Sequence, residues 1–213
     1  MKTRYALVVS LLALLPNALV AQKWEIGGVG GGSFYTSTDV TRPNGKVEAK
    51  FAPGFAAGVL IGQDMGRYWG GDIRYTYQRN NAELSGAGGK ASFGAESHSI
   101  HYDALLHFAS AGKRTRPFIS VGAGVKLYRG TGTEAVTQAL SEYALLTKTT
   151  DLRPVVTFGA GVKVRVGAHS NLRLEVKDYF TPAPEKVIQP NRNADISGWI
   201  HNFVPMIAIS YIF

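Results

Sequence analysis

Two histidines and an aspartate lie at strand spacing in one stretch of the chain and are the first candidates for chemistry. His101 and Asp103 are two residues apart, and His107 follows four residues later. Alternate residues of a strand share a face, so an aspartate at this spacing could orient an imidazole as a general base. No serine can be placed beside the pair, and six residues separate the histidines by about 20 Å along a strand, too far for one metal ion. We therefore expect no catalytic residue and no metal site here.

A second histidine stands beside a serine in the tripeptide His169-Ser170-Asn171. It resembles the H-x-S-N pattern of outer-membrane lipid A deacylases, but the spacer residue is missing. Ser and Asn are also ordinary residues of short turns. An enzyme that modifies lipid, acting through His101 or His169, is thus an alternative, while the expectation is that the protein is not an enzyme.

Two glycine-rich stretches could suggest a phosphate-binding loop. Residues 27–32 read GGVGGG and residues 86–90 read GAGGK. The first lies in a predicted strand with no helix after it, and the second is followed by Ala91 where a phosphate loop needs Ser or Thr. Close strand packing and a flexible loop explain them, so no cofactor is expected.

The elements that would position these residues are strands, and one strand occurs in two similar copies. Residues 116–128 read RPFISVGAGVKLY and residues 153–165 read RPVVTFGAGVKVR. In both copies alternate residues are apolar, and those between them are polar or very small, which is the period of a strand with one apolar face. Six further stretches show this period, at residues 24–35, 53–63, 67–79, 97–109, 171–180 and 200–213.

The connections between the eight predicted strands alternate in length. Short turns join strands two and three, four and five, and six and seven, whereas long loops are expected at residues 36–52, 80–96, 130–152 and 181–199. An up-and-down barrel with short turns at one rim and long loops at the other is typical of bacterial outer-membrane barrels. Apolar residues at helical spacing predict a short helix at 134–146. The alternative to a membrane barrel is a soluble barrel whose apolar face points inward. The many Gly and Ser residues on the polar face argue against a soluble barrel, because they fit a narrow lumen better than a surface in water.

Composition limits the classes of protein that fit. The 213 residues suffice for a single all-β domain, and the absence of Cys excludes disulfides and thiolate metal sites. The net charge of +8 is spread at strand spacing rather than in blocks, so nucleic acid is not an expected partner.

The first residues have the pattern of a secretory signal peptide. Lys2 and Arg4 precede an apolar run over residues 5–15, and Ala21 offers a cleavage site. The run is too short for a spanning helix. We therefore expect a signal peptide at 1–21 and a barrel domain at 22–213.

The polar face of the predicted strands carries many charged residues that would point into the barrel lumen. Because an unpaired buried ion is costly, we expect them to form ion pairs that plug the lumen. Cations outnumber anions among them, so a narrow pore that favours anions is the alternative. The predicted lumen residues are Asp72, Arg74, His101, Asp103, Lys126, Lys163, Arg165, Arg173, Glu175 and Lys177.

The two RP-x-x-x-x-GAGV strands and the last strand, which ends PMIAISYIF, carry a family resemblance. The whole predicted mature chain resembles the small outer-membrane β-barrel family that includes the outer-membrane protein A transmembrane domain and the opacity-type surface antigens. The resemblance implies an eight-stranded antiparallel up-and-down transmembrane β-barrel in the outer membrane of a Gram-negative bacterium. Tyr211 and Phe213 resemble the signal that the barrel-assembly machinery reads in that family.

The function expected from these features is structural or surface interaction through the long loops, since loops on rigid scaffolds usually carry function. The surface-antigen members of the family favour the same interpretation. The expected partners are outer-membrane lipid, lipopolysaccharide and the assembly machinery. We expect a monomer, because a closed barrel has no free edge to pair.

Overall fold

The computed structural model describes residues 23–135, 137–196 and 198–213. The predicted signal peptide 1–21 and its cleavage site after Ala21 lie outside these residues. Strands and turns make up the described chain, and it contains no helix. Accordingly, no helix long and apolar enough to span a bilayer occurs in the described part.

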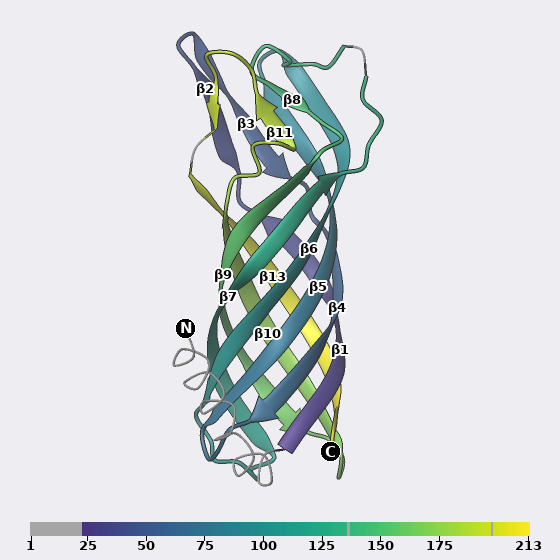
Figure 1. Ribbon diagram of the computed structural model, residues 1–213, viewed down its shortest axis with the longest axis vertical. Coiled ribbons are helices and arrows are strands. Elements are labelled where there is room, and N and C mark those ends of the chain that lie inside the picture. Colours follow the sequence, from purple (N-terminus) through teal and green to yellow (C-terminus); the bar gives the residue numbers. More distant parts are fainter. Residues whose placement is uncertain (1–22, 136, 197) are drawn as a thin grey trace, which may run out of the picture.

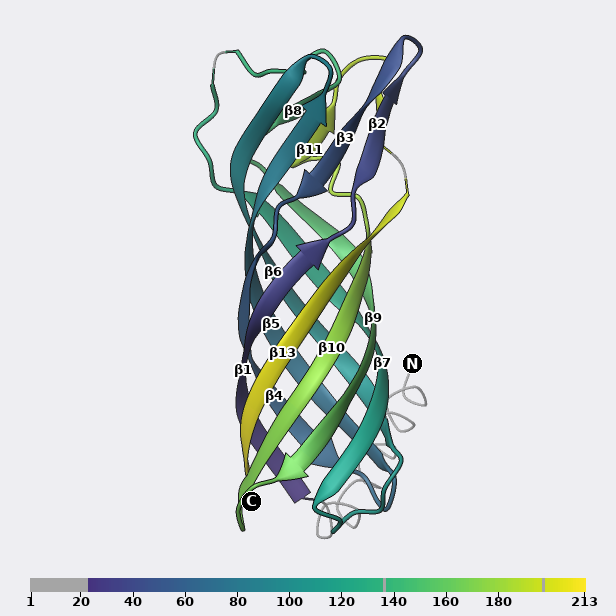
Figure 2. The same ribbon diagram turned by 180° about the vertical axis from the view of Figure 1, so that it is seen from behind.

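Eight long strands pair antiparallel with their neighbours in a ring (Figures 1 and 2). β1 pairs with both β4 and β13, and the β5–β6 pairing closes the ring on the other side. The all-β, antiparallel, up-and-down architecture predicted from the sequence is therefore confirmed. The long strands are β1 (Lys23–Tyr35), β4 (Gly54–Asp64), β5 (Trp69–Gly86), β6 (Gly89–His107), β7 (Thr115–Gly130), β9 (Thr150–Arg165), β10 (Ser170–Pro182) and β13 (Trp199–Ile212).

Five short strands gather beyond the ring at the end away from the C-terminus (Figure 1). β2 pairs with β3, β3 pairs with β5, β12 pairs with β2, and β11 pairs with β8. These strands turn three of the predicted long loops into ordered structure. They are β2 (Thr38–Arg42), β3 (Gly45–Phe51), β8 (Ala144–Leu146), β11 (Ile188–Pro190) and β12 (Asp195–Ile196).

Two predictions about the loops are wrong. Residues 80–96 form no open loop, because β5 and β6 stay paired as far as Gly86 and Gly89. The helix expected at 134–146 is replaced, over the described residues, by turns and β8, and Leu140 has a φ of +62° that a helix cannot contain. In both places contacts with neighbouring segments overrode the local sequence pattern.

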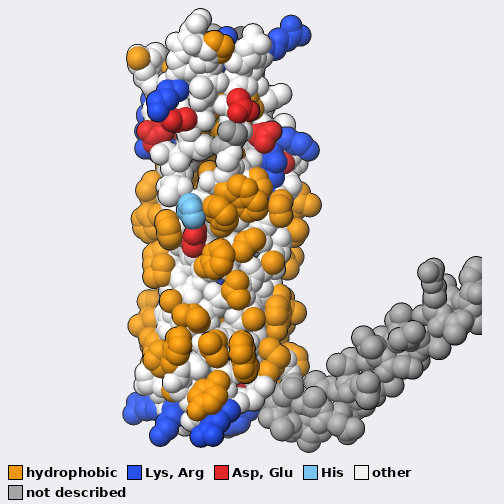
Figure 3. All heavy atoms as spheres, turned by 90° about the vertical axis from the view of Figure 1, so that its left-hand side faces the viewer, with side chains coloured by type: hydrophobic (Ala, Val, Ile, Leu, Met, Phe, Trp, Pro, Cys, Tyr) orange, Lys and Arg blue, Asp and Glu red, His pale blue; other side chains and the backbone are white. Residues whose placement is uncertain are grey.

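The apolar face of the strands points outward and the polar face points inward. On β5, Ile73 is 55% exposed, whereas its neighbour Arg74 is fully buried. On the face drawn in Figure 3, apolar side chains form a broad band along the barrel, and Lys and Arg side chains gather at its two ends. The soluble-barrel alternative required the opposite orientation and is wrong.

Glycines on the inward face of β1 allow close approach to β13. A Cβ added at Gly27 would lie 2.6 Å from the carbonyl oxygen of Ile209, whereas one added at the outward-facing Gly28 would meet no atom closer than 4.0 Å. We expect Gly27→Ala to lower the free energy of unfolding by about 1–3 kcal/mol, because the two strands must separate. Gly28→Ala should leave it nearly unchanged. Urea titration of the folded, faster-migrating band on unboiled gels measures both, and equal losses would contradict the packing argument.

Candidate functional site: a paired polar interior beneath an ordered cap

The barrel interior holds nine of the ten predicted lumen residues. Asp72, Arg74, His101, Asp103, Lys126, Lys163, Arg173, Glu175 and Lys177 are all buried inside the ring. Arg165 instead lies, partly exposed, at the short-turn rim. We use short-turn rim for the end of the barrel formed by Lys23, Phe213 and the connections at 64–69, 107–115 and 165–170.

The interior nearest the short-turn rim is organised around Glu25, which the sequence analysis did not select. Its carboxylate accepts hydrogen bonds from Lys163 and Arg173, both at 2.8 Å, and from Asn171 and Ser210 at 3.0 and 2.9 Å. Glu25 sits on the polar parity of a predicted strand, so the alternation of that strand was the signal that could have found it. Its four donors come from three other strands, which it ties together across the lumen.

A second group of ion pairs lies around Arg74 and Arg173. Arg173 Nη1 donates to Asp72 Oδ2 at 2.6 Å. Arg74 Nη1 donates to Glu175, and its Nη2 lies 3.4 Å from Asp72 Oδ2. Four charges on two opposite walls of the barrel therefore neutralise one another, as expected for ions taken out of water.

The third group contains the candidate His–Asp pair. His101 Nε2 lies 3.2 Å from Asp103 Oδ2, and the same carboxylate accepts a hydrogen bond from Lys177 at 2.8 Å. Thr157 donates to the other carboxylate oxygen at 2.5 Å. Both members of the pair are buried, and the hydrogen bonds from Thr157 and Lys177 hold the Asp103 carboxylate in place.

Lys126 occupies a different environment from the other interior cations. Its ammonium donates to the amide oxygens of Gln78 and Asn202, both at 3.1 Å, and it has no carboxylate within ion-pair distance among the described residues. Aromatic rings surround the charge, and their negative faces stabilise a desolvated cation. The ring centroids lie 4.9, 5.2 and 5.1 Å away and belong to Tyr35, Tyr128 and Tyr179.

The second histidine motif lies outside the barrel at the short-turn rim. The His169 ring stacks on Tyr211 at 5.6 Å, and its Nδ1 lies 3.1 Å from the carbonyl oxygen of Ile212. No ion pair of His169 occurs in the described chain. Likewise, the described residues contain no cluster of His, Asp and Glu that could hold a metal ion.

The predicted assembly residues are accessible. Tyr211 and Phe213 point outward at the short-turn rim, and both are exposed. The backbones of Phe213 and Trp24 exchange two hydrogen bonds, of 3.3 and 3.0 Å, so the last residue completes the β1–β13 pairing.

The far end of the barrel is covered by an ordered cap, defined here as the described residues of 36–53, 80–96, 130–150 and 182–199. Its apolar side chains face inward and form a core of their own. The Gln138 side chain fixes β8 by hydrogen bonds to both the N–H and the C=O of Leu146. Buried members of this core within the cap are Val40, Val47, Ala49, Phe51, Ala82, Leu84, Phe93, Ala95, Leu140, Ala144, Leu146, Ala183, Val187, Ile188 and Ile196.

The outer surface of the cap is polar and locally paired. Lys46 donates to Asp39 at 2.8 Å across the β2–β3 hairpin, and this hydrogen bond raises the pKa of Lys46. Lys90 lies 3.1 Å from Glu83 on the neighbouring hairpin. The cap therefore presents charged hairpins to solvent and keeps its apolar residues inside.

Comparison with known proteins gives the chain a family. Residues 5–189 match the family described as outer membrane protein beta-barrel domain, whereas no curated protein matches the sequence. The crystal structure of OprG from Pseudomonas aeruginosa superimposes with a TM-score of 0.64 at 12% identity, over 91% of this chain and 96% of that one. Neisserial surface protein A superimposes with a TM-score of 0.56 at 10% identity, over 90% and 97% of the two chains. At these identities the structures share the fold, and the match over most of the sequence shows that the chain belongs to the outer membrane protein β-barrel family and is a protein of the bacterial outer membrane.

Proposed function

We propose that the mature protein is an eight-stranded transmembrane barrel with a closed lumen, which holds the cap at the cell surface as a rigid interaction surface. The signal peptide 1–21 would direct export, and Tyr211 and Phe213 would engage the barrel-assembly machinery. The short-turn rim would face the periplasm, as in bacterial outer-membrane barrels generally. The lipid-facing band then serves as an anchor, surrounded by outer-membrane lipid and lipopolysaccharide.

One observation carries the closed-lumen proposal, namely that the interior carboxylates are paired. Glu25, Asp72, Asp103 and Glu175 each contact at least one Lys or Arg. An eight-stranded barrel is just wide enough for side chains to fill it. Ion passage needs sites that ions can enter and leave. In this barrel the positions beside the interior carboxylates are already occupied by Lys and Arg side chains of the protein itself.

The cap supports the interaction role, because its segments are held in place before any partner arrives. An ordered surface loses less conformational entropy on binding than mobile loops do. Its core and its strand pairings supply that order within the described residues.

Planar-bilayer recording tests the closed lumen. We expect the refolded protein to give no steady unitary current, and Lys126→Ala and Lys163→Ala to leave the trace equally flat. A shift between boiled and unboiled samples on a gel confirms that each variant is folded. Regular current steps whose size changes in either variant would instead support the narrow pore.

The enzyme alternative has less support. His101 is buried beside Asp103, whose carboxylate also pairs with Lys177. His169 contacts a ring and a backbone carbonyl. A lipid-modifying activity would appear as a change in lipid A mass that disappears when either histidine is replaced.

A further inference from the structure

The net positive charge of the described chain is concentrated at the short-turn rim. The cap segments together with the strand ends beside them, residues 36–53, 79–96, 129–153 and 178–196, carry ten basic and ten acidic residues, so they are neutral. The rim and the interior beside it carry seven basic residues and two acidic ones. The basic residues are Lys23, Arg67, Lys113, Arg114, Arg116, Lys163 and Arg165, and the acidic ones are Glu25 and Asp64.

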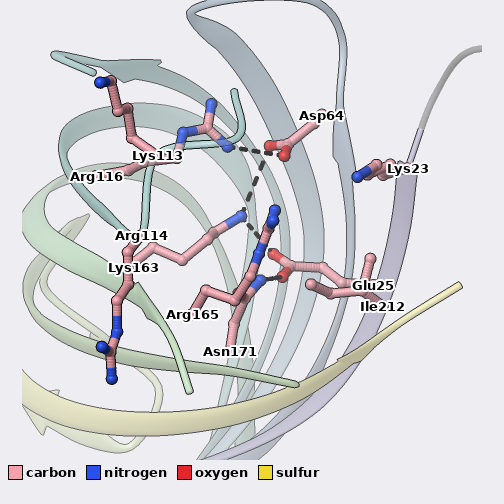
Figure 4. A pocket seen from close by; sticks show the side chains of 10 residues that line it. All are labelled: Lys23, Glu25, Asp64, Lys113, Arg114, Arg116, Lys163, Arg165, Asn171 and Ile212. Carbon is pink, nitrogen blue, oxygen red and sulfur yellow. Dashed lines mark hydrogen bonds and ion pairs between the residues drawn. The ribbon is translucent and has the colours of Figure 1, made fainter. Parts of the chain in front are cut away.

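These cations surround a concave site. A recess of about 390 Å³ opens at the rim and is lined by Lys23, Arg67 and Arg165, with Asp64 as its one carboxylate. Lys113, Arg114 and Arg116 border the adjoining hollow. Figure 4 shows Arg116 and Lys163 pointing toward the carboxylates of this hollow, whereas Lys113 and Arg114 point away from them. We call the two hollows together the basic mouth.

Arg116 lies at the floor of the basic mouth and has an unused donor. Its Nη1 bonds to Asp64 Oδ2 at 2.7 Å, and its Nε donates to the carbonyl oxygen of Ala109 at 3.4 Å. Arg116 is only 3% exposed, and its Nη2 nevertheless has no hydrogen-bond partner among the described residues. A buried N–H without an acceptor is costly, and an oxyanion in the mouth would supply the acceptor.

The level of the mouth along the barrel indicates where that oxyanion comes from. Exposed aromatic side chains mark the same rim, among them Trp69, Phe108 and Phe213. Such rings lie at membrane interfaces, at the level of the lipid headgroups. Figure 3 shows Lys and Arg side chains directly below the apolar band, which is where the phosphates of the facing leaflet lie.

We propose that the basic mouth binds the phosphate group of an anionic phospholipid from the periplasmic leaflet. Arg116, Arg165 and Lys23 would contact the phosphate from inside the rim, and Arg67, Lys113 and Arg114 would attract the headgroup from its outer edge. The periplasmic source rests on the orientation proposed above, whereas the preference for an anionic phosphate rests only on the charges and the geometry of the mouth.

The association of spin-labelled phosphatidylglycerol and phosphatidylcholine with the mature protein in phosphatidylcholine nanodiscs tests this proposal. We expect the wild type to prefer phosphatidylglycerol over phosphatidylcholine by about fivefold or more, because a single Lys or Arg beside an anionic lipid already changes the association constant by roughly that factor. The triple variant Lys23→Gln, Arg67→Gln, Arg165→Gln removes the basic lining of the recess and should lose most of that preference. Its matched control removes three cap cations, by Lys46→Gln, Lys90→Gln and Lys148→Gln, and should keep it.

Three outcomes would overturn the proposal: no preference in the wild type, equal loss in the two triple variants, or full competition by millimolar glycerol phosphate. The second would mean that only net charge matters, and the third that the mouth takes a soluble phosphate. Nanodiscs expose both rims and carry no current. A wild type that conducts in a planar bilayer would therefore contradict the closed-lumen proposal without affecting the lipid preference measured in nanodiscs. Failure of the closed-lumen proposal and failure of the lipid proposal are thus distinguishable.

Discussion

Arg173→Gln is expected to lower the free energy of unfolding of the barrel by about 3–5 kcal/mol, the usual cost of removing one partner from a buried ion pair. The Arg173 guanidinium bonds to Glu25 at 2.8 Å and to Asp72 at 2.6 Å, and all three side chains are nearly inaccessible. Glutamine keeps a polar group there but supplies no charge, so both carboxylates remain in the interior with weaker compensation.

Urea unfolding in lipid vesicles measures the loss, with the unboiled gel shift and tryptophan fluorescence as two independent readouts. The matched control is Arg129→Gln, since Arg129 also pairs with a carboxylate, Glu96, at 3.5 Å, but its side chain is 58% exposed. Exposed pairs contribute about 0–1 kcal/mol. If both variants lost the same small amount, water would be reaching the interior charges, and the closed-lumen proposal would lose its main support.

The inward and outward faces of the strands could be predicted from the sequence, because a strand has only two faces. Once Ile73 is placed outside, Arg74 must point inside. The same alternation places Glu25 and Arg116 on the polar, inward face of their strands, so both could be predicted in this way.

The partners of the interior charges could not be predicted, because they depend on the stagger of the strands around the ring. Arg74 bonds to Glu175, which lies 101 residues away in sequence. Lys126 is the clearest case. An ion pair was the natural expectation for a buried lysine, and the structure instead surrounds it with amides and tyrosine rings.

The cap was missed for a related reason. The glycines at 86, 88 and 89 and the polar residues around them are loop signals, but Ala82, Leu84 and Phe93 continue the strand period on both sides of them. Those apolar residues have no lipid to face. They are explained only by the cap core, which is assembled from four segments far apart in the chain.

Leu146→Ala is expected to open the cap while the barrel below it stays folded. Leu146 is 1% exposed in the cap core and lies on β8, opposite Ile188 of β11. Truncating a buried leucine costs about 2–5 kcal/mol, because a cavity remains. The β8–β11 pair belongs to a separate two-stranded sheet, so the loss should be local rather than shared with the ring.

Limited trypsin digestion followed by mass spectrometry measures the effect. Cleavage after Lys148 should be much faster in Leu146→Ala than in the wild type, whereas the heat-dependent gel shift of the barrel should persist. Leu145→Ala is the matched control, since the neighbouring side chain is 38% exposed on the outer side of the same strand, and it should behave like the wild type.

The comparison decides what kind of surface the cap provides. A cap that opens in Leu146→Ala, and stays closed in Leu145→Ala, is a folded unit whose charged hairpins are held in one arrangement by an apolar core, as recognition of a defined partner requires. If both variants were cleaved at the rate of the wild type, the core would contribute little, and the pairings of β2, β3, β5 and β6 alone would have to hold the hairpins. Rapid cleavage of all three proteins would mean that these segments move in solution, and a partner would then have to order them at the cost in affinity that ordering carries.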